Sequence, residues 1–230
     1  MAYGNEITVE KLRLLRSGFI ELREGSLYAI IGDLLGLTGL AVIVAYIGFP
    51  LSITINESPL ESAAPTLLIG AAVALVGIII SIIGLIRWKN SGKYFREFDP
   101  LSFSSADTGP ALMLWGSYLV VLILIVFIAG VLVLSFGAIV ASLILALAAG
   151  ILVFIGAILF GVFLLKIKNL RLFYGLNVPD FTVDAVLWFL GILFEVLYIV
   201  AEIIIYIHSG EALTAIIVKE REMTRQGSQG

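Results

Sequence analysis

Residues 111–165 read ALMLWGSYLVVLILIVFIAGVLVLSFGAIVASLILALAAGILVFIGAILFGVFLL and contain no charged side chain. A helix crosses the hydrocarbon core of a bilayer with about 20 apolar residues, so this block is too long for one crossing. A turn at residues 135–137 (Ser-Phe-Gly) divides it into two predicted spans, about 111–134 and 138–165. The block therefore predicts an integral membrane protein built from helices.

The composition of the whole chain agrees with this prediction. Hydrophobic residues make up 60% of the 230 positions, whereas soluble domains contain about 45–50%. The net charge of -3 offers no basic surface for nucleic acid. The chain has no cysteine and one histidine, His208, which excludes disulfides, thiolate catalysis and His-cluster metal sites. We therefore expect no metal, no cofactor and no enzymatic activity.

Three more apolar segments predict spans at about residues 26–49, 66–86 and 183–208. Together with the two spans of the long block they predict an all-α bundle of five spans. The residues after the last span, 209–230, form a polar C-terminal tail.

The segment before the first span, residues 1–25, has an amphipathic pattern. Leu12, Leu15, Phe19 and Leu22 share one helical face, and the charged residues lie mostly away from it. This pattern predicts a helix that lies on the membrane surface and leads into the first span. The alternative is a solvated helix that is docked on the loops.

All 14 lysines and arginines fall into four clusters, at residues 11–23, 87–96, 166–171 and 219–225. Because basic residues stay in the cytoplasm, five spans place the N-terminus inside and the C-terminus outside. The fourth cluster conflicts with this topology. A hairpin within the last span would bring it inside, but no Gly, Pro or Asn lies between Phe194 and His208.

The second and fourth spans end alike, with a basic residue, a Lys-Asn pair and two aromatic residues in both residues 87–95 and residues 166–174. The match predicts a duplicated helical hairpin. The alternative is that both span ends collect the basic and aromatic residues that are common at membrane interfaces.

Small residues recur at a spacing of four and three in the first two spans. Such stripes let helix backbones approach closely where lipid provides no hydrophobic drive for association. We therefore expect tight packing along both stripes. Their members are Gly25, Ala29, Gly32, Gly36 and Gly39 in the first span and Gly70, Ala74, Gly77, Ser81 and Gly84 in the second.

Three short sequences carry a family resemblance: LREGSLYAII at residues 22–31, GLIRWK at 84–89 and LRLFY at 170–174. They resemble the domain-of-unknown-function family 973, which comprises uncharacterised multi-span membrane proteins of thermophilic archaea. The likeness covers most of residues 12–208. It implies a helical membrane fold and an archaeal host, and it implies no activity.

Carboxylates inside the predicted spans are the main candidates for function. A charge at the bilayer centre costs about 2.5–3.5 kcal/mol on insertion scales, so each must be neutral, hydrated or paired. Asp33 lies in the first span, and the fifth span carries a polar face at Asp184, Trp188, Gly191, Glu195, Tyr198, Glu202 and Tyr206. The candidate polar or ion site comprises Asp33, Glu195, Tyr198, Glu202 and Tyr206.

Three interpretations of this polar face remain open. The first is that the face forms a path or site for a proton, a cation or a ligand. The second is that it fixes helix packing through hydrogen bonds. The third is that it receives another subunit. We predict a multi-pass cell-membrane protein that acts as a structural or accessory subunit, with a membrane-protein partner or a second copy of the chain. The alternative is a small proton- or cation-coupled transporter.

Overall fold

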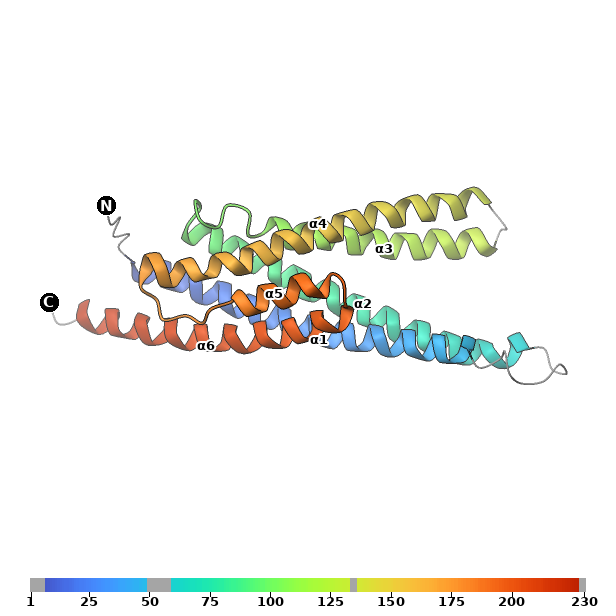
Figure 1. The fold of residues 1–230 in the computed structure, drawn as a ribbon, viewed down its shortest axis with the longest axis horizontal. Helices are drawn as coiled ribbons and strands as arrows, with labels where there is room; N and C mark the ends of the chain where they lie inside the picture. The colour runs from blue at the N-terminus through green and yellow to red at the C-terminus, as the bar shows by residue number, and fades with distance from the viewer. Residues whose placement is uncertain (1–6, 49–58, 133–135, 228–230) are drawn as a thin grey trace.

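The structure is a computed structural model that describes residues 7–48, 59–132 and 136–227, and this part of the chain is helical and contains no strand. Figure 1 shows the helices lying along one long axis. They are α1 (Val9–Gly48), α2 (Pro59–Phe98), α3 (Thr108–Leu132), α4 (Phe136–Tyr174), α5 (Thr182–Gly191) and α6 (Glu195–Gly227).

Four of these helices, α1, α2, α4 and α6, are long and apolar enough to cross a membrane. The 40 residues of α1 extend for about 60 Å at 1.5 Å per residue. That is about twice the 30 Å of the hydrocarbon core, so much of α1 extends beyond a single crossing. The predicted division of residues 111–165 into two helices is confirmed by the bounds of α3 and α4. The predicted turn residue Ser135 lies outside the described residues.

The helices form three antiparallel pairs (Figure 1). Helix α1 packs along α2, α3 packs along α4, and the short α5 packs against α6. The α1–α2 and α3–α4 hairpins diverge towards one end of the molecule. We call this end the far end.

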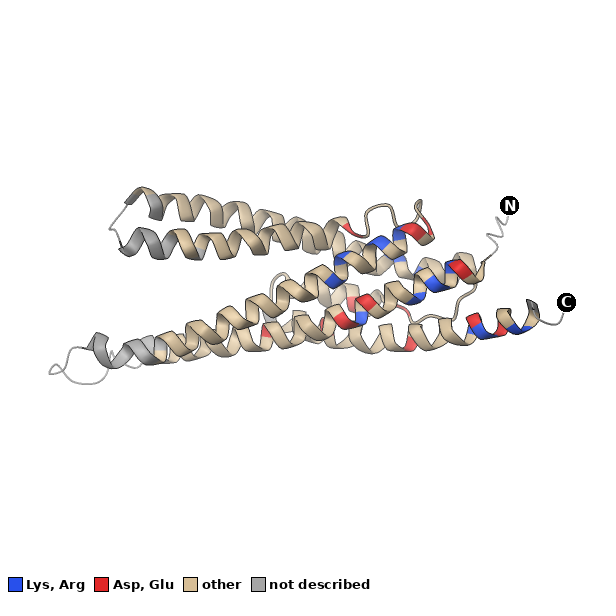
Figure 2. Cartoon of the chain, turned by 180° about the vertical axis from the view of Figure 1, so that it is seen from behind, with Lys and Arg blue, Asp and Glu red and all other residues tan. Residues whose placement is uncertain are grey.

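The opposite end carries the lysines and arginines of the helices. Figure 2 shows lysines and arginines from four helices gathered there, beside both chain termini. We call it the basic end. Ion pairs connect its helices: Arg87 of α2 lies 3.0 Å from Glu21 of α1, and Arg13 of α1 lies 3.3 Å from Glu220 of α6.

A core of aromatic side chains lies between the helices in the basic half of the molecule. Phe95 is fully buried and has ring centroids 5.0 Å from Phe19 and 5.1 Å from Phe163. The two hairpins also meet through Trp88 and Phe160, which stack with centroids 4.6 Å apart. The far half has many exposed aliphatic side chains instead, as expected for surfaces that face lipid.

Small residues bring the helices of both hairpins into backbone contact. A Cβ at Gly77 would lie 2.6 Å from the carbonyl oxygen of Gly32, so no larger residue fits there without a shift. The same holds seven residues along each helix, where a Cβ at Gly84 would lie 2.8 Å from the oxygen of Gly25. In the second hairpin the equivalent contact joins Gly156 to the oxygen of Gly109, at 2.7 Å.

The N-terminal segment differs from the prediction. It is not a separate surface helix, because α1 runs without interruption from Val9 to Gly48. Its apolar face is covered by protein and not by lipid: Leu12, Leu15 and Phe19 are 0% exposed in the shared core. An amphipathic pattern indicates that one face is buried, but it does not say whether lipid or protein covers it.

The predicted fifth span is wrong. The chain reverses between α5 and α6, so residues 183–208 form a helical hairpin instead of one helix. Gly191 permits the reversal, because a Cβ there would lie 2.8 Å from the Tyr198 ring. The turn, at residues 192–194, thus comes just before the stretch between Phe194 and His208 that contains no Gly, Pro or Asn. Figure 1 shows the hairpin tip partway along α1 and α2.

The reversal also changes the predicted topology. Helix α6 continues through the predicted polar tail to Gly227 and returns to the basic end. The start of α1 and the end of α6 therefore lie at the same end of the molecule, whereas five continuous spans would place them at opposite ends. All four basic clusters now lie at one end, which removes the conflict that the five-span topology left.

Candidate functional site

A cavity of about 180 Å³ lies where the three helix pairs meet, and all six helices contribute to its wall. We call it the inner cavity. Its polar groups are carboxyls and hydroxyls, and none of its lining residues is a lysine or an arginine. The residues that line it are Ala29, Asp33, Ser81, Leu85, Trp88, Met113, Ser117, Val153, Ala157, Trp188, Tyr198 and Glu202.

Two carboxyl groups from distant parts of the chain meet in this cavity. Glu202 of α6 is 2% exposed, and its carboxyl interacts with that of Asp33 of α1 through charge and a hydrogen bond. Ser81 of α2 donates a hydrogen bond of 2.9 Å to Oδ1 of Asp33. The second carboxyl oxygen of Glu202, Oε2, is buried and has no hydrogen-bond partner among the described residues.

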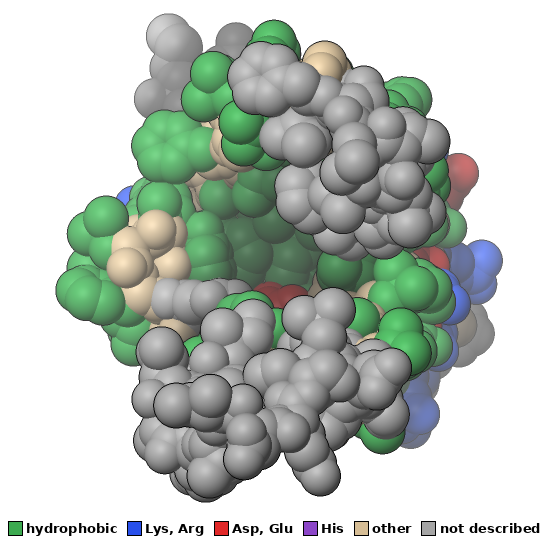
Figure 3. Space-filling view, turned by 90° about the vertical axis from the view of Figure 1, so that its right-hand side faces the viewer, with side chains coloured by type: hydrophobic (Ala, Val, Ile, Leu, Met, Phe, Trp, Pro, Cys, Tyr) green, Lys and Arg blue, Asp and Glu red, His purple; other side chains and the backbone are tan. Residues whose placement is uncertain are grey.

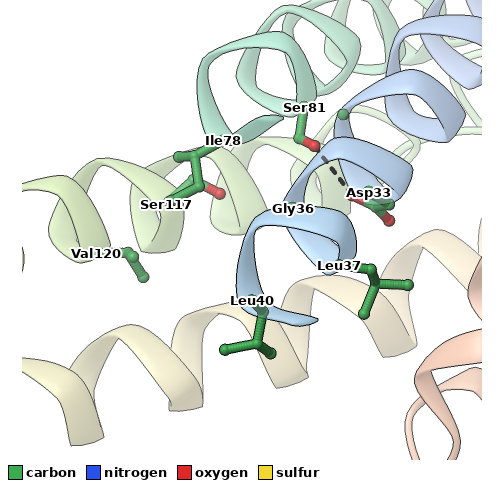
Figure 4. Close-up of a pocket in the computed structure, with 9 residues that line it drawn as sticks. Asp33, Gly36, Leu37, Leu40, Ile78, Ser81, Ser117 and Val120 are labelled. Carbon is green, nitrogen blue, oxygen red and sulfur yellow. Dashed lines mark hydrogen bonds between the residues drawn. The ribbon is translucent and has the colours of Figure 1, made fainter. Parts of the chain in front are cut away.

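A second cavity of about 250 Å³ continues from Asp33 towards the far end. We call it the outer cavity. It shares Asp33, Ser81 and Ser117 with the inner cavity and extends to Leu40 on α1 and Val120 on α3. Figure 4 shows Asp33 and Ser117 on opposite walls, with the hydrogen bond from Ser81 to Asp33.

Viewed from the far end, the molecule is hollowed at its centre (Figure 3). The wall of the hollow is mainly hydrophobic, and acidic atoms are visible inside it. An apolar approach that leads to carboxyl groups therefore opens towards the far end.

Aromatic rings form one side of the inner cavity. The Trp88 and Trp188 rings have centroids 5.4 Å apart and planes inclined by 79°, and Tyr198 lies 4.6 Å from Trp188 at 68°. Both indole N–H groups donate to atoms of other helices: Trp88 Nε1 to the Leu22 carbonyl at 3.3 Å and Trp188 Nε1 to the Ala157 carbonyl at 2.8 Å. These bonds fix the rings in place.

The structure separates the predicted site residues into three groups. Asp33, Tyr198 and Glu202 line the inner cavity. Tyr206 instead accepts a hydrogen bond of 2.9 Å from Arg23 of α1. Glu195 is the first residue of α6, and its side chain lies outside the described part of the structure.

The predicted packing residues lie mainly between α1 and α2. Gly36 is an exception, because a Cβ at this position would meet nothing within 4 Å and the residue lines the outer cavity. Gly39 and Gly70 do meet, since a Cβ at Gly39 would lie 2.6 Å from the Gly70 oxygen. Ser81 has a second role as the hydrogen-bond donor to Asp33.

The chemistry of the carboxyl pair follows from its geometry. Two carboxyl groups in contact repel strongly when both are charged, so we expect the pair to share one proton and to carry one negative charge at most. Among the described residues there is no group of three or more His, Cys, Asp or Glu side chains that could hold a metal ion.

Six residues that line the inner cavity belong to none of the predicted sites, polar faces or packing stripes: Leu85, Trp88, Met113, Ser117, Val153 and Ala157. Trp88 lies in the GLIRWK sequence that carries the family resemblance, and it is not one of the two matched aromatic residues of the repeated span ending. Ser117 had a signal that was not used, because it follows Gly116 as Asp33 follows Gly32. Both glycines lie against the partner helix of their own hairpin.

The fold and the cavity define the class as an all-helical protein with four helices that could cross a membrane and a carboxyl pair between helices, of which Glu202 is buried and Asp33 is partly buried. The chain belongs to the family described as "Protein of unknown function (DUF973)", whose family model matches residues 16–229. The family resemblance in the sequence is thereby confirmed. Comparisons with curated proteins and with solved structures gave no match.

Proposed function

We propose that this protein is a membrane transport protein in which the Asp33–Glu202 pair takes up and releases a proton or a cation. The observation that carries the proposal is the position of the pair, in a cavity to which all six helices contribute. Ionisable groups within membrane-spanning segments are rare and commonly mark ion and substrate pathways, which makes them candidates for a functional site. The outer cavity supplies an approach to the pair.

The proposed topology has four crossings, α1 to α4, and a re-entrant hairpin, α5–α6. Helix α3, with 25 residues, is counted as a crossing because it pairs with α4 along its length. Helix α6 is not counted, although it is long enough, because it begins at the hairpin tip and returns to the basic end. The 10 residues of α5 extend for about 15 Å, half of the hydrocarbon core, before the chain turns back. An even number of crossings places both termini and all 14 basic residues on the cytoplasmic side of the cell membrane. The far end then faces the outside.

The re-entrant hairpin gives the proposal a structural precedent in transporters. Helices that end within the membrane expose backbone groups, which are tolerated where they are buried in protein or line a water-filled cavity. The tip between Gly191 and Glu195 adjoins Tyr198, which lines the inner cavity. The hairpin therefore brings the carboxyl of Glu202 and the end of a helix to the same cavity.

Proton flux in liposomes tests this function. Purified protein is reconstituted with a pH-sensitive dye inside, and a membrane potential is imposed with potassium and valinomycin. We expect acidification with the wild-type chain and its loss with Glu202→Gln, which keeps the shape of a protonated carboxyl. Glu211→Gln, at an exposed position of the same helix, should retain the flux. Absence of flux in the wild type, for protons and for added cations, would remove the transport function.

A second candidate is the non-enzymatic accessory subunit predicted from the sequence. The hollow between the two hairpins favours it, because its mainly hydrophobic wall (Figure 3) would accept an apolar helix of a partner or of a second copy. Extraction from native membranes in mild detergent distinguishes the two functions. An accessory subunit should co-purify with a larger membrane protein, whereas a transporter should support flux alone.

A further inference from the structure

We propose that the inner cavity binds a small organic ammonium cation, held between the Glu202 carboxylate and the rings of Trp88, Trp188 and Tyr198. This inference deepens the proposed function by naming the class of cation. Its evidence is the make-up of the cavity wall and a buried acceptor that the protein does not satisfy.

The buried acceptor is Oε2 of Glu202. Glu202 is 2% exposed and lines the inner cavity. Its Oε2 has no hydrogen-bond partner among the described residues. A buried polar atom without a partner destabilises the folded state, and a charged one more so. A donor held in the cavity removes this cost, and an ammonium group supplies both a donor and the compensating charge.

The aromatic rings select the kind of cation. Consecutive rings in the series Trp88, Trp188 and Tyr198 are inclined by 79° and 68°, so they form adjoining walls rather than a flat stack. Aromatic walls of this kind attract alkylammonium ions through the negative charge of the ring faces, with Trp the strongest. The indole N–H groups are already bonded to other helices, so the rings need no rearrangement to receive the ligand.

Calcium and magnesium fit the same cavity poorly. Calcium takes six to eight oxygen ligands and magnesium a nearly ideal octahedron of oxygens. The inner cavity offers two carboxyls with the hydroxyls of Ser81, Ser117 and Tyr198, and the rest of its wall is apolar or aromatic. An organic ammonium ion uses both kinds of surface, because its alkyl groups cover the apolar wall while its charge faces Glu202.

A proton and an ammonium ion compete for the carboxyl pair. An ammonium ion favours the charged form of Glu202, so its binding releases the proton that the pair holds. The exchange is balanced in charge: one cation enters the cavity and one proton leaves. This coupling is what a proton-driven exchanger of organic cations requires.

Intrinsic tryptophan fluorescence tests the cage directly. The chain has three tryptophans, and Trp115 is 62% exposed and does not line the cavity. In the Trp115→Phe background the emission therefore comes from the two cage residues. Tetramethylammonium chloride is titrated into this protein in lipid nanodiscs, with sodium chloride at equal ionic strength as the reference.

We expect a saturable change in emission with tetramethylammonium that sodium does not produce. Glu202→Gln should weaken the affinity by about tenfold or more, which corresponds to about 1.4 kcal/mol. Trp188→Phe should weaken it by about threefold, since Phe attracts cations less than Trp. Glu211→Gln should leave the affinity unchanged. A signal that follows ionic strength alone, or an affinity unchanged by Glu202→Gln, would overturn the proposal.

A second readout does not depend on the folding of the Glu202 variant. The chain has no cysteine, so Ser117→Cys places a single thiol in the cavity wall. Tetramethylammonium should slow its alkylation by a small neutral reagent at least about threefold, and equal rates with tetramethylammonium and sodium would contradict the cage. Proton flux without this protection would leave the proposed function standing and reject the cage. Protection without proton flux would support the cage and reject the proposed transport function.

Discussion

Trp88 of α2 lies on Phe160 of α4, with the ring centroids 4.6 Å apart and the planes inclined by 22°. Trp88 comes four residues after Gly84, which contacts α1, and Phe160 comes four residues after Gly156, which contacts α3. The two rings therefore occupy equivalent places in the two hairpins. Their stack joins the hairpins beside the inner cavity, where Trp88 also forms part of the wall.

The first prediction concerns this stack. Trp88→Ala and Phe160→Ala should each lower the free energy of unfolding by about 3–5 kcal/mol, because each removes a large, fully packed ring. The two changes share one contact, so the double variant should lose less than the sum. Unfolding in mixed micelles measures the effect. Trp115→Ala, at a position 62% exposed, is the control and should cost far less.

The second prediction compares two glycines that belong to the same predicted packing stripes. Gly77→Leu should destabilise the α1–α2 hairpin by about 1–3 kcal/mol or more, because even a Cβ would lie 2.6 Å from the Gly32 oxygen. Gly36→Leu should be nearly neutral, since a Cβ there meets nothing within 4 Å. Thermal melting in detergent tests the pair. Coincident melting curves for the two variants would contradict the packing that the structure describes.

The contrast between these glycines shows what the sequence could and could not predict. The four-and-three spacing located the helix face that packs, because that spacing depends on the helix alone. It could not show that a cavity, the outer cavity, separates Gly36 from α3. That information depends on how the two hairpins diverge, which no local pattern encodes. The duplicated hairpin agrees with the matched glycine contacts and stays a prediction.

The hairpin of α5 and α6 could not be predicted from the sequence, because it too depends on tertiary contacts. Residues 183–208 have the composition of one spanning helix, and the turn at 192–194 (Ile-Leu-Phe) contains no usual turn former. The reversal is stabilised by contacts between α5 and α6, such as Trp188 against Tyr198. Tertiary contact thus decides against the local helical preference. The unexplained basic cluster at 219–225 was the sequence signal for the reversal.

The third prediction tests the resulting topology. Single cysteines introduced as Lys93→Cys and Glu222→Cys, both at exposed positions, should react with a membrane-impermeant thiol reagent from the same side of oriented vesicles. The reason is that α2 and α6 both end at the basic end. The cysteine-free parent chain is the blank. Labelling of the two positions from opposite sides would restore the five-span topology.

The fourth prediction concerns acid stability at the basic end. Burial tends to raise the pKa of Asp99, but hydrogen bonds from Ser102, Tyr174 and Leu101 outweigh it and hold the pKa below its ordinary value of 3.8. The Tyr174 hydroxyl, at 2.9 Å, connects the end of α4 to the loop after α2. The charged form therefore stabilises the folded state above the ordinary pKa, and this stabilisation is lost as the pH falls through the lower, folded-state value.

Melting temperatures between pH 3 and pH 7 measure this contribution. Asp99→Asn should lower the melting temperature at pH 7 and flatten its decline in acid, because the amide cannot titrate. Glu97→Gln, two residues earlier at an exposed position, should keep the pH profile of the wild type. An Asp99→Asn profile that parallels the wild type down to pH 3 would show that Asp99 does not contribute.

The last prediction concerns the closure of the re-entrant hairpin. Nδ1 of His208 on α6 lies 2.8 Å from Oδ2 of Asp184 on α5, and the Asp184 side chain is fully buried. A double-mutant cycle with Asp184→Ala and His208→Ala should give a coupling energy of about 1–3 kcal/mol, as for groups in contact within one network.

The exposed pair Lys219 and Glu222, 3.6 Å apart within α6, is the matched control for that cycle. Its coupling should stay below about 0.5 kcal/mol, because solvent screens it and both long side chains lose freedom. Asp184 and His208 lie in one predicted span but meet only if the chain reverses between them, since 24 residues of continuous helix would separate them by about 36 Å. A coupling near zero would therefore contradict the hairpin itself, and with it the placement of Glu202 in the inner cavity.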